Sequence, residues 1–172
     1  MKYAFAVLFS SLFFSQISIA QTTFQRAYGG TAMDEGTSVR QTTDGGYIIA
    51  GTSTSYGSGG RDILVIKTNA FGDTIWTKTF GGATDNEYGF CVQQTTDGGY
   101  IVSGVASSFA DVAGDMYLLK LTPTGDTSWS RTYGGIGYEW GAYVQQTNDG
   151  GYIIAGQTPA FGAGGFDAYL VK

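Results

Sequence analysis

The stretch QTTDGGYIIAG, residues 41–51, decides the fold because the chain contains it three times. It returns as QTTDGGYIVSG at residues 94–104 and as QTNDGGYIIAG at residues 146–156. The copies are spaced 53 and 52 residues apart. A nearly constant period of this length predicts a repeat architecture such as a propeller, a solenoid or an array.

Each copy contains an Asp-Gly-Gly turn between two apolar segments. Asp-Gly is the pair whose backbone reaches the positive φ that a tight hairpin demands. The sequence therefore predicts three tight turns, each with a turn-forming carboxylate and a structural glycine: Asp44 and Gly45, Asp97 and Gly98, and Asp149 and Gly150.

One complete repeat shows four short segments of strand character, separated by turn signals. They are residues 88–95, 100–105, 116–121 and 127–133. No apolar run has the 3.6-residue period of a helix. Segments such as 47–50 and 63–66 are apolar on both faces, so each strand must be covered on both sides. Four strands in about 50 residues, buried on both faces and repeated, are typical of a β-propeller blade.

The edges of these units also carry repeated side chains. Arg26, Lys78 and Arg131 keep the period within each fourth segment. A charged side chain on an edge strand discourages further pairing. We therefore expect the fourth segment to be the outer edge of each blade.

The combined pattern resembles a known group of proteins. DGGYIIAG, a Ser/Gly loop, D-x-x-L-x-K, G-D-T-x-W and a Gly pair are similar to the tandem β-propeller repeats of secreted bacterial proteins, whose blades resemble those of the quinoprotein (PQQ-binding) superfamily. The resemblance covers residues 22–172. It implies four-stranded antiparallel blades, with repeat units near 35–80, 88–133 and 141–172 plus a strand at 22–28, and with the first strand of each unit innermost.

In such families a tryptophan closes the outer strand and packs one blade on the next. By this resemblance the structural role falls to Trp76 and Trp129, with Phe24 in the first copy. Many members of these families are several times longer than this chain.

The first 20 residues have the pattern of a cleaved secretory signal peptide. Lys2 precedes an apolar run, and the segment ends Ser-Ile-Ala at residues 18–20. The run is too short for a membrane anchor. We expect export, a mature domain of residues 21–172 that does not insert into the membrane, and a location outside the cell or at its surface.

The composition narrows the range of partners. The 172-residue chain has a formal net charge of −5, 28 Gly and no His. A mildly acidic chain is a poor partner for nucleic acid, and without His it lacks the commonest general base. Cys91 is the single cysteine, so no disulfide forms within one chain, and we expect it to be a small buried residue of the innermost strand.

Six carboxylates form two repeated sets of candidate ligand-binding residues. Asp34, Glu87 and Glu139 precede the first strand of each unit, and Asp62, Asp115 and Asp167 precede the third. The strand order places both sets on one face, where they could converge on a cation or a sugar. The alternative is that each carboxylate accepts backbone N–H bonds and fixes its loop. No spacing typical of a calcium loop is present.

These observations favour an exported, non-enzymatic repeat module that mediates binding or adhesion, with no cofactor, no metal and a protein or glycan partner. One alternative is a glycan-binding, lectin-like propeller. Another is a fragment of a larger secreted enzyme, a quinoprotein oxidoreductase or a glycan hydrolase. Carboxylates that recur identically in every repeat argue against hydrolysis, which needs two carboxylates of different character.

The number of strands raises a question of closure. Segment 22–28, two full sets of four strands and three further strands would make twelve, or three blades, if the first strand completes the last blade. Three blades are fewer than the four to eight typical of propellers. We therefore predict one of two arrangements. Either two chains form one six-bladed ring, each donating residues 22–28 to the other, or the three blades form an open arc, a partial propeller with apolar end faces.

Overall fold

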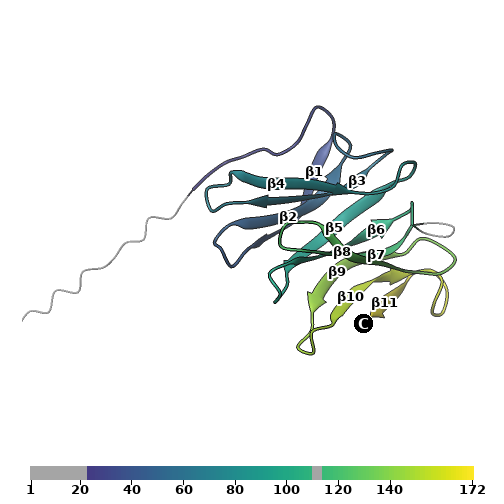
Figure 1. Ribbon diagram of the computed structural model, residues 1–172. Coiled ribbons are helices and arrows are strands. Elements are labelled where there is room, and N and C mark those ends of the chain that lie inside the picture. The colour runs from purple at the N-terminus through teal and green to yellow at the C-terminus, as the bar shows by residue number, and fades with distance from the viewer. Residues whose placement is uncertain (1–22, 110–113) are drawn as a thin grey trace, which may run out of the picture.

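The computed structural model of the protein describes residues 23–109 and 114–172 (Figure 1). These residues form eleven antiparallel strands in three sheets, with no helix among them. The all-β repeat predicted from the sequence is therefore confirmed. The predicted signal peptide at residues 1–20 lies outside the described residues. No described helix is long and apolar enough to cross a membrane.

The three sheets follow the repeat. Sheet 1 contains β1 (Asp34–Gln41), β2 (Tyr47–Ser53), β3 (Asp62–Thr68) and β4 (Thr74–Phe80). Sheet 2 contains β5 (Glu87–Gln94), β6 (Tyr100–Ala106), β7 (Asp115–Leu121) and β8 (Thr127–Tyr133). Sheet 3 contains β9 (Trp140–Gln146), β10 (Tyr152–Thr158) and β11 (Asp167–Val171). Within each sheet the strands lie in chain order, so every connection joins neighbouring antiparallel strands.

The Asp-Gly-Gly turns join the first and second strands of each sheet. Their second residues adopt positive φ, at 81° for Gly45, 80° for Gly98 and 83° for Gly150. The left-handed region is accessible to glycine at no steric cost. This is why the turn needs glycine at this position in all three copies.

The sheets pack face to face, as the three-layered arrangement in Figure 1 shows. One apolar cluster lies between sheets 1 and 2 and includes Ile48 and Val65 from the first and Val102 and Leu119 from the second. A second cluster joins sheets 2 and 3 through residues such as Met116 and Ile154. Complete burial of such a side chain contributes about 1.5–3 kcal/mol, so these two interfaces are the main source of stability.

Strands β3 and β6 are buried at every residue. This agrees with the prediction that apolar segments of this kind are covered on both faces. The outer strands β4 and β8 are more exposed, and the charged Lys78 and Arg131 lie on them.

A ring contact repeats at each junction between sheets. Trp76 of β4 meets Tyr100 of sheet 2 at 5.8 Å between ring centroids, and Trp129 of β8 meets Tyr152 of sheet 3 at 5.6 Å. Both tryptophans contact the next sheet, as the resemblance implies, and both are only partly buried. The reason is that β4 and β8 are edge strands, so solvent reaches one side of each indole.

Two expectations about the ends of the repeat need correction. A strand was expected at residues 22–28, but the described part of this segment, residues 23–28, pairs with no neighbour in a ladder. The described residues therefore contain eleven strands rather than twelve. Closure does not occur either, since sheets 1 and 3 are the two ends of the described stack and each has an open face. A strand needs a partner edge, and segment 23–28 contacts sheet 1 without pairing with the edge of any described strand.

Candidate functional site

The Asp-Gly-Gly turns are built from a repeated set of hydrogen bonds. Asp97 accepts the hydroxyl of Thr95 at 2.5 Å and the amide of Gly99 at 3.0 Å. Asp44 makes the same contacts with Thr42 and Gly46, and Asp149 with Thr147 and Gly151. The three carboxylates therefore stabilise the turns, as the sequence predicts.

A lysine completes each of these turns. Lys120 is almost fully buried, and its Nζ lies 2.9 Å from Asp97 Oδ2 and 3.0 Å from the carbonyl of Leu121. Lys67 and Asp44 repeat the pair at 2.9 Å. Hydrogen bonds from the threonine hydroxyl and then from the lysine lower the pKa of Asp44 and of Asp97 to about 2.

The sequence contains a signal for this pairing that the motif analysis missed. Each lysine follows its aspartate by 23 residues, and the third pair is Asp149 and Lys172. A charged pair that keeps one offset through three repeats indicates contact between the Asp-Gly-Gly turn and the end of the third strand. The same interactions lower the pKa of Asp149, first through the hydrogen bond from Lys172.

The first repeated set of carboxylates accepts hydrogen bonds from the loops. Asp34 receives the hydroxyls of Ser53 and Ser55 and the amide of Gly30 at 2.8 Å. Burial raises the pKa of Asp34, but these hydrogen bonds outweigh it and leave a lowered pKa. A carboxylate with several donors is already satisfied and fixes the start of its strand.

The equivalent Glu87 is fully buried and accepts the amides of Gly82 and Ser108 at 3.0 and 2.9 Å. Glu139, also fully buried, accepts the hydroxyl of Thr158 at 2.9 Å. Its second oxygen, Oε2, has no hydrogen-bond partner within the described part of the chain.

The second set approaches the first across the junctions between sheets. A Cβ added to Gly81 would lie 2.1 Å from Asp62 Oδ1 and 2.5 Å from Glu87 Oε2, so both carboxylates face one point. Gly134 occupies the same place between Asp115 and Glu139. Burial, and then the charge of Glu87, raises the pKa of Asp62.

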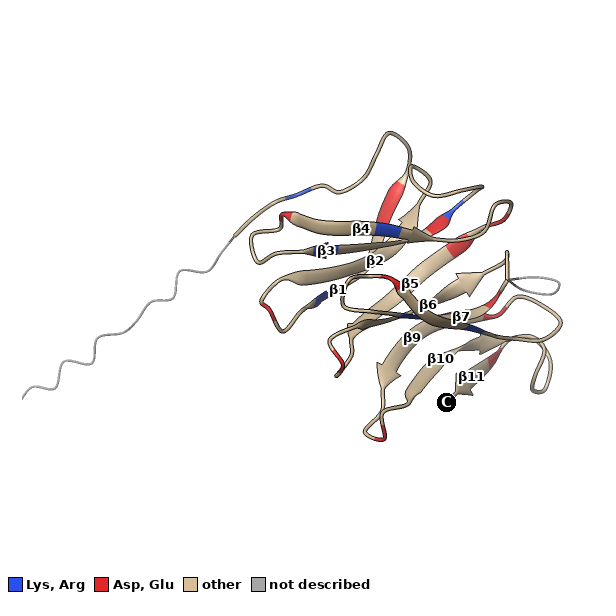
Figure 2. Cartoon of the chain, viewed as in Figure 1, with Lys and Arg blue, Asp and Glu red and all other residues tan. Residues whose placement is uncertain are grey.

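The structure thus brings four of the six candidates together in two pairs. Asp34 lies beside Gly29 at the open end of sheet 1, and Asp167 accepts the amide of Ala163 at 3.0 Å at the open end of sheet 3. Acidic residues gather at the strand ends and hairpin tips (Figure 2). Among the described residues, no group of three or more acidic, Cys or His side chains could hold a metal ion.

A different group of side chains breaks the repeat. Phe90 of β5 stacks on Trp140 of β9 at 5.3 Å between centroids and an interplanar angle of 13°. Tyr88 stacks on Phe90 at 6.4 Å between centroids, and Tyr138 tilts against Trp140 at 5.5 Å. We call these four residues the aromatic shelf. Arg61 extends it, with its guanidinium 5.6 Å from the Tyr88 ring centroid.

The backbone explains why Phe90 reaches the shelf. The pairing of β5 with β6 shifts between Gly89 and Cys91, which makes Phe90 the extra residue of a β-bulge. A bulge redirects the side chain of its extra residue away from the ordinary alternation of the strand. The same shift between Gly36 and Ser38 leaves Thr37 as the extra residue in β1.

The shelf borders a hollow of about 540 Å³ that spans the first strands of all three sheets. Thr37, Ser38 and Arg40 line it from β1, while Phe90, Trp140 and Tyr143 supply aromatic surface. Trp140 is 40% exposed and Tyr143 69% exposed. A concavity lined mostly by apolar and aromatic side chains, with a few polar groups, is the common form of a small-ligand site.

Cys91 also contributes to the lining of this hollow, and it is buried, as the sequence predicts. Its thiol faces the carbonyl of Val144 at 3.9 Å. The equivalent positions are Ser38 and Tyr143, so this place varies from sheet to sheet.

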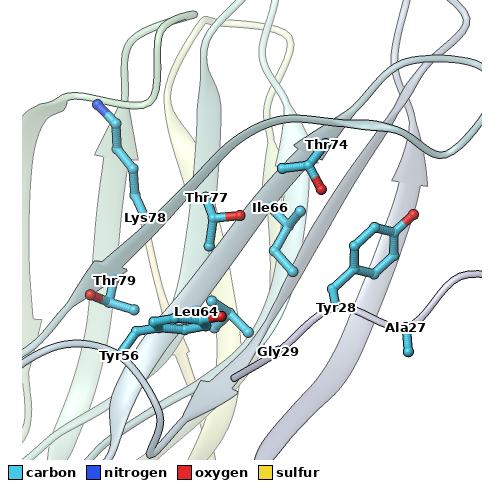
Figure 3. Close-up of a pocket in the computed structure, with 10 residues that line it drawn as sticks. All are labelled: Ala27, Tyr28, Gly29, Tyr56, Leu64, Ile66, Thr74, Thr77, Lys78 and Thr79. Carbon is cyan, nitrogen blue, oxygen red and sulfur yellow. The ribbon is translucent and has the colours of Figure 1, made fainter. Parts of the chain in front are cut away.

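A second hollow, of about 460 Å³, lies on the open face of sheet 1 (Figure 3). Tyr28, Tyr56, Leu64 and Ile66 gather around it, and hydroxyls of β4 line its rim. Leu64 occupies the position of Tyr117 in sheet 2 and Tyr169 in sheet 3, so a smaller side chain leaves this space. We interpret this hollow as space that stays open because no other described sheet packs on this face of sheet 1.

The sequence matches no protein-family model and no curated protein. The aromatic shelf is therefore identified by its geometry. The motif analysis missed it because it followed positions that repeat. The residues of the shelf are recognisable in the sequence as departures from the repeat. Phe90 stands where the other copies have Thr37 and Ala142, and Trp140 stands where the first copy has Glu35.

Proposed function

We propose that the chain is an exported, non-enzymatic binding module whose three sheets are blades of β-propeller type. The aromatic shelf is the observation that supports this function. In a propeller the first strand of each blade faces the central channel, so the shelf and its hollow would lie on the inner surface. The carboxylates, in turn, would fix the loops that hold the blades.

The chemistry of the shelf favours a glycan as the ligand, which makes a lectin-like module the second candidate function. The rings of Phe90 and Trp140 are nearly parallel and stacked, and the apolar face of a sugar can lie against the exposed part of Trp140. Thr37, Ser38 and Arg40 offer hydrogen-bond partners along the same hollow. The net charge of −5 disfavours nucleic acid, the other ligand that stacks on such rings.

A glycan array probed with the secreted chain tests this function. We expect Trp140→Ala and Phe90→Thr, which restores the residue type of the first repeat, to reduce binding about tenfold or more, since aromatic anchors dominate such contacts. The matched control is Phe71→Ala, an aromatic residue that is 61% exposed in the turn between β3 and β4. Equal binding by all four proteins would disprove a role for the shelf.

Binding to proteins but not to glycans would favour the adhesion module over the lectin. A pull-down from outer-surface material with the wild type and Trp140→Ala distinguishes the two cases. Loss of capture in the variant assigns the same shelf to a protein ligand.

A further inference from the structure

Segment 23–30 lies on sheet 1 as β4 lies on sheet 2. Phe24 meets Tyr47 at 5.7 Å and 65°, and Trp76 meets Tyr100 at 5.8 Å and 67°. A Cβ on Gly72 would touch Phe24, just as one on Gly125 would touch Trp76. The segment therefore occupies the place of an outer strand that belongs to a preceding sheet.

Polar contacts repeat in the same way. Arg26 lies 3.7 Å from Asp73 in the β3–β4 turn, and Lys78 lies 2.5 Å from Asp126 in the β7–β8 turn. The amide of Gly30 donates to Asp34 as that of Gly82 donates to Glu87. These contacts hold the segment in an outer-strand position although it pairs with no described strand.

The other end of the stack has the complementary gap. Sheet 3 has three described strands, and β11 pairs only with β10 within that part of the chain. Its open face exposes Leu170 at 65% and Tyr143 at 69%. On the opposite end of the stack, sheet 1 exposes Val39 at 53%.

The two open faces have the residue types that pack together inside the molecule. In the interface between sheets 1 and 2, Ala50 and Val65 of one sheet join Val92 and Leu119 of the next. The equivalent residues on the open faces are Ala155 and Leu170 of sheet 3, and Val39 and Ile66 of sheet 1. Each open face is thus a copy of a face that is buried elsewhere in the same chain.

A hydrogen bond that repeats at the Asp-Gly-Gly turns also supports contact between the two open faces. Gln94 accepts the amide of Thr43 from the preceding sheet at 2.8 Å, and Gln146 accepts that of Thr96 at 2.9 Å. Gln41 is the equivalent glutamine at the open face of sheet 1, and the amide of Asn148 is the equivalent donor at that of sheet 3.

We infer that sheet 3 of one chain packs on sheet 1 of a second copy, whose residues 24–28 become the fourth strand beside β11. This arrangement rests on the propeller architecture proposed above. The registers of β3 with β4 and of β7 with β8 fix the pairing: Lys67 lies opposite Trp76, and Lys120 opposite Trp129. The intermolecular partners are therefore Lys172 with Phe24, Leu170 with Arg26 and Ala168 with Tyr28.

Two such contacts close two chains into a ring of six sheets, within the range of four to eight typical of propellers. The interface is head to tail, and it closes because the second contact repeats the first. Light scattering on the secreted chain is expected to show a dimer. A monomer at all concentrations overturns the inference.

Cysteine cross-linking tests the register. The chains carry Cys91→Ser, which removes the native thiol and introduces the residue type that the first repeat has at this position, Ser38. A chain with Arg26→Cys is mixed with a chain with Leu170→Cys. We expect a disulfide-linked pair in the mixture, at least about tenfold more than with Ala27→Cys in place of Arg26→Cys, because a one-residue slip turns the side chain to the other face.

The double variant, with Arg26→Cys and Leu170→Cys in one chain, identifies the partner. A bond between chains supports the second copy, whereas a bond within one chain overturns it. Amide exchange provides a readout that needs no substitution. The amides of residues 24–28 are expected to gain protection as the concentration of wild-type chain rises, and unchanged exchange contradicts the inference.

Failure of this assembly is distinguishable from failure of the shelf. Phe90 lies on β5 of the middle sheet, which is covered on both sides and takes no part in the proposed interface, so Phe90→Thr is expected to keep the dimer while it loses the ligand.

Discussion

Sheets 2 and 3 share the repeated motif but have different surroundings. Strand β6, YIVSGVA, is buried at all seven residues, whereas β10, YIIAGQT, is only partly buried. Leu118 of β7 is 4% exposed and its equivalent in β11, Leu170, is 65% exposed. The side chain of Lys120 is 5% exposed and that of Lys172 is 54% exposed. The comparison shows that the contribution of a repeated residue to the free energy of unfolding depends on whether a neighbouring sheet covers it.

The largest expected effect separates the two equivalent leucines. Leu118→Ala is expected to lower the free energy of unfolding by about 2–4 kcal/mol, because it removes a buried side chain and leaves a cavity. Leu170→Ala is expected to change it by less than about 0.5 kcal/mol in the monomer. Urea denaturation at low protein concentration checks both. Equal losses would mean that sheet 3 is covered as fully as sheet 2.

The ring contacts give the next effect. Trp129→Ala is expected to cost about 2 kcal/mol, below the range for a fully buried aromatic residue, since the indole is only partly buried. Phe24→Ala is expected to cost less than about 1 kcal/mol, because Phe24 is 39% exposed and its segment has no strand partner. Thermal unfolding followed by circular dichroism measures both. A larger loss for Phe24→Ala would contradict the weaker anchoring of its segment.

The carboxylates of the Asp-Gly-Gly turns extend the comparison of sheets 2 and 3 to the pH dependence of stability. Asp97→Asn is expected to lower the free energy of unfolding by about 1 kcal/mol at pH 7. This loss is smaller than for a fully buried ion pair because Asp97 is largely exposed, although Lys120 is buried. Asp149→Asn is expected to match the wild type more closely, since Lys172 is exposed.

The sign of the pH dependence follows from the lowered pKa of Asp97, about 2 against an ordinary value of 3.8. The unfolded chain binds this proton first, so the stabilisation is complete above about pH 4 and is lost as the pH falls towards 2. Denaturation of the wild type and Asp97→Asn across this window checks the prediction. The difference between them should shrink with falling pH, and a difference that grows would contradict it.

The smallest effect concerns Ser103 in β6. It is fully buried, and its hydroxyl has no hydrogen-bond partner among the described residues. The equivalent positions in the other sheets are Ala50 and Ala155. Ser103→Ala is expected to leave stability unchanged or to raise it by up to about 1 kcal/mol, because it removes an unsatisfied polar group. A clear loss in urea denaturation would indicate a partner for this hydroxyl.

The motif that repeats predicted the local structure well. The Asp-Gly-Gly turns, the four-strand order of sheet 2 and the double-sided burial of β3 all follow from turn chemistry and apolar patterning, which act over a few residues. The lysine partner of each turn was equally readable from its constant offset of 23 residues from the aspartate. The strand expected at residues 22–28 was wrong because a strand also needs a neighbouring edge, which the local pattern does not supply.

The candidate site was less accessible to sequence reasoning. The six repeated carboxylates drew attention because they recur, and the contacts of Asp34 and Glu87 show them bonded to loop amides and hydroxyls. The aromatic shelf combines Phe90 with Trp140, which are 50 residues apart in the chain. Their stacking depends on a bulge in β5 and on the distance between two sheets, and neither is set by the residues themselves.

The sequence by itself determined the period, the strands and the turns of this protein, because backbone φ preferences and alternating burial are properties of a few adjacent residues. Only the tertiary structure decided which copy of each repeated residue is buried and which is open. It also decided which side chains of different repeats meet. The physical reason is that burial and stacking depend on the packing of one sheet against the next, so identical motifs acquire different roles at the middle and at the ends of the stack.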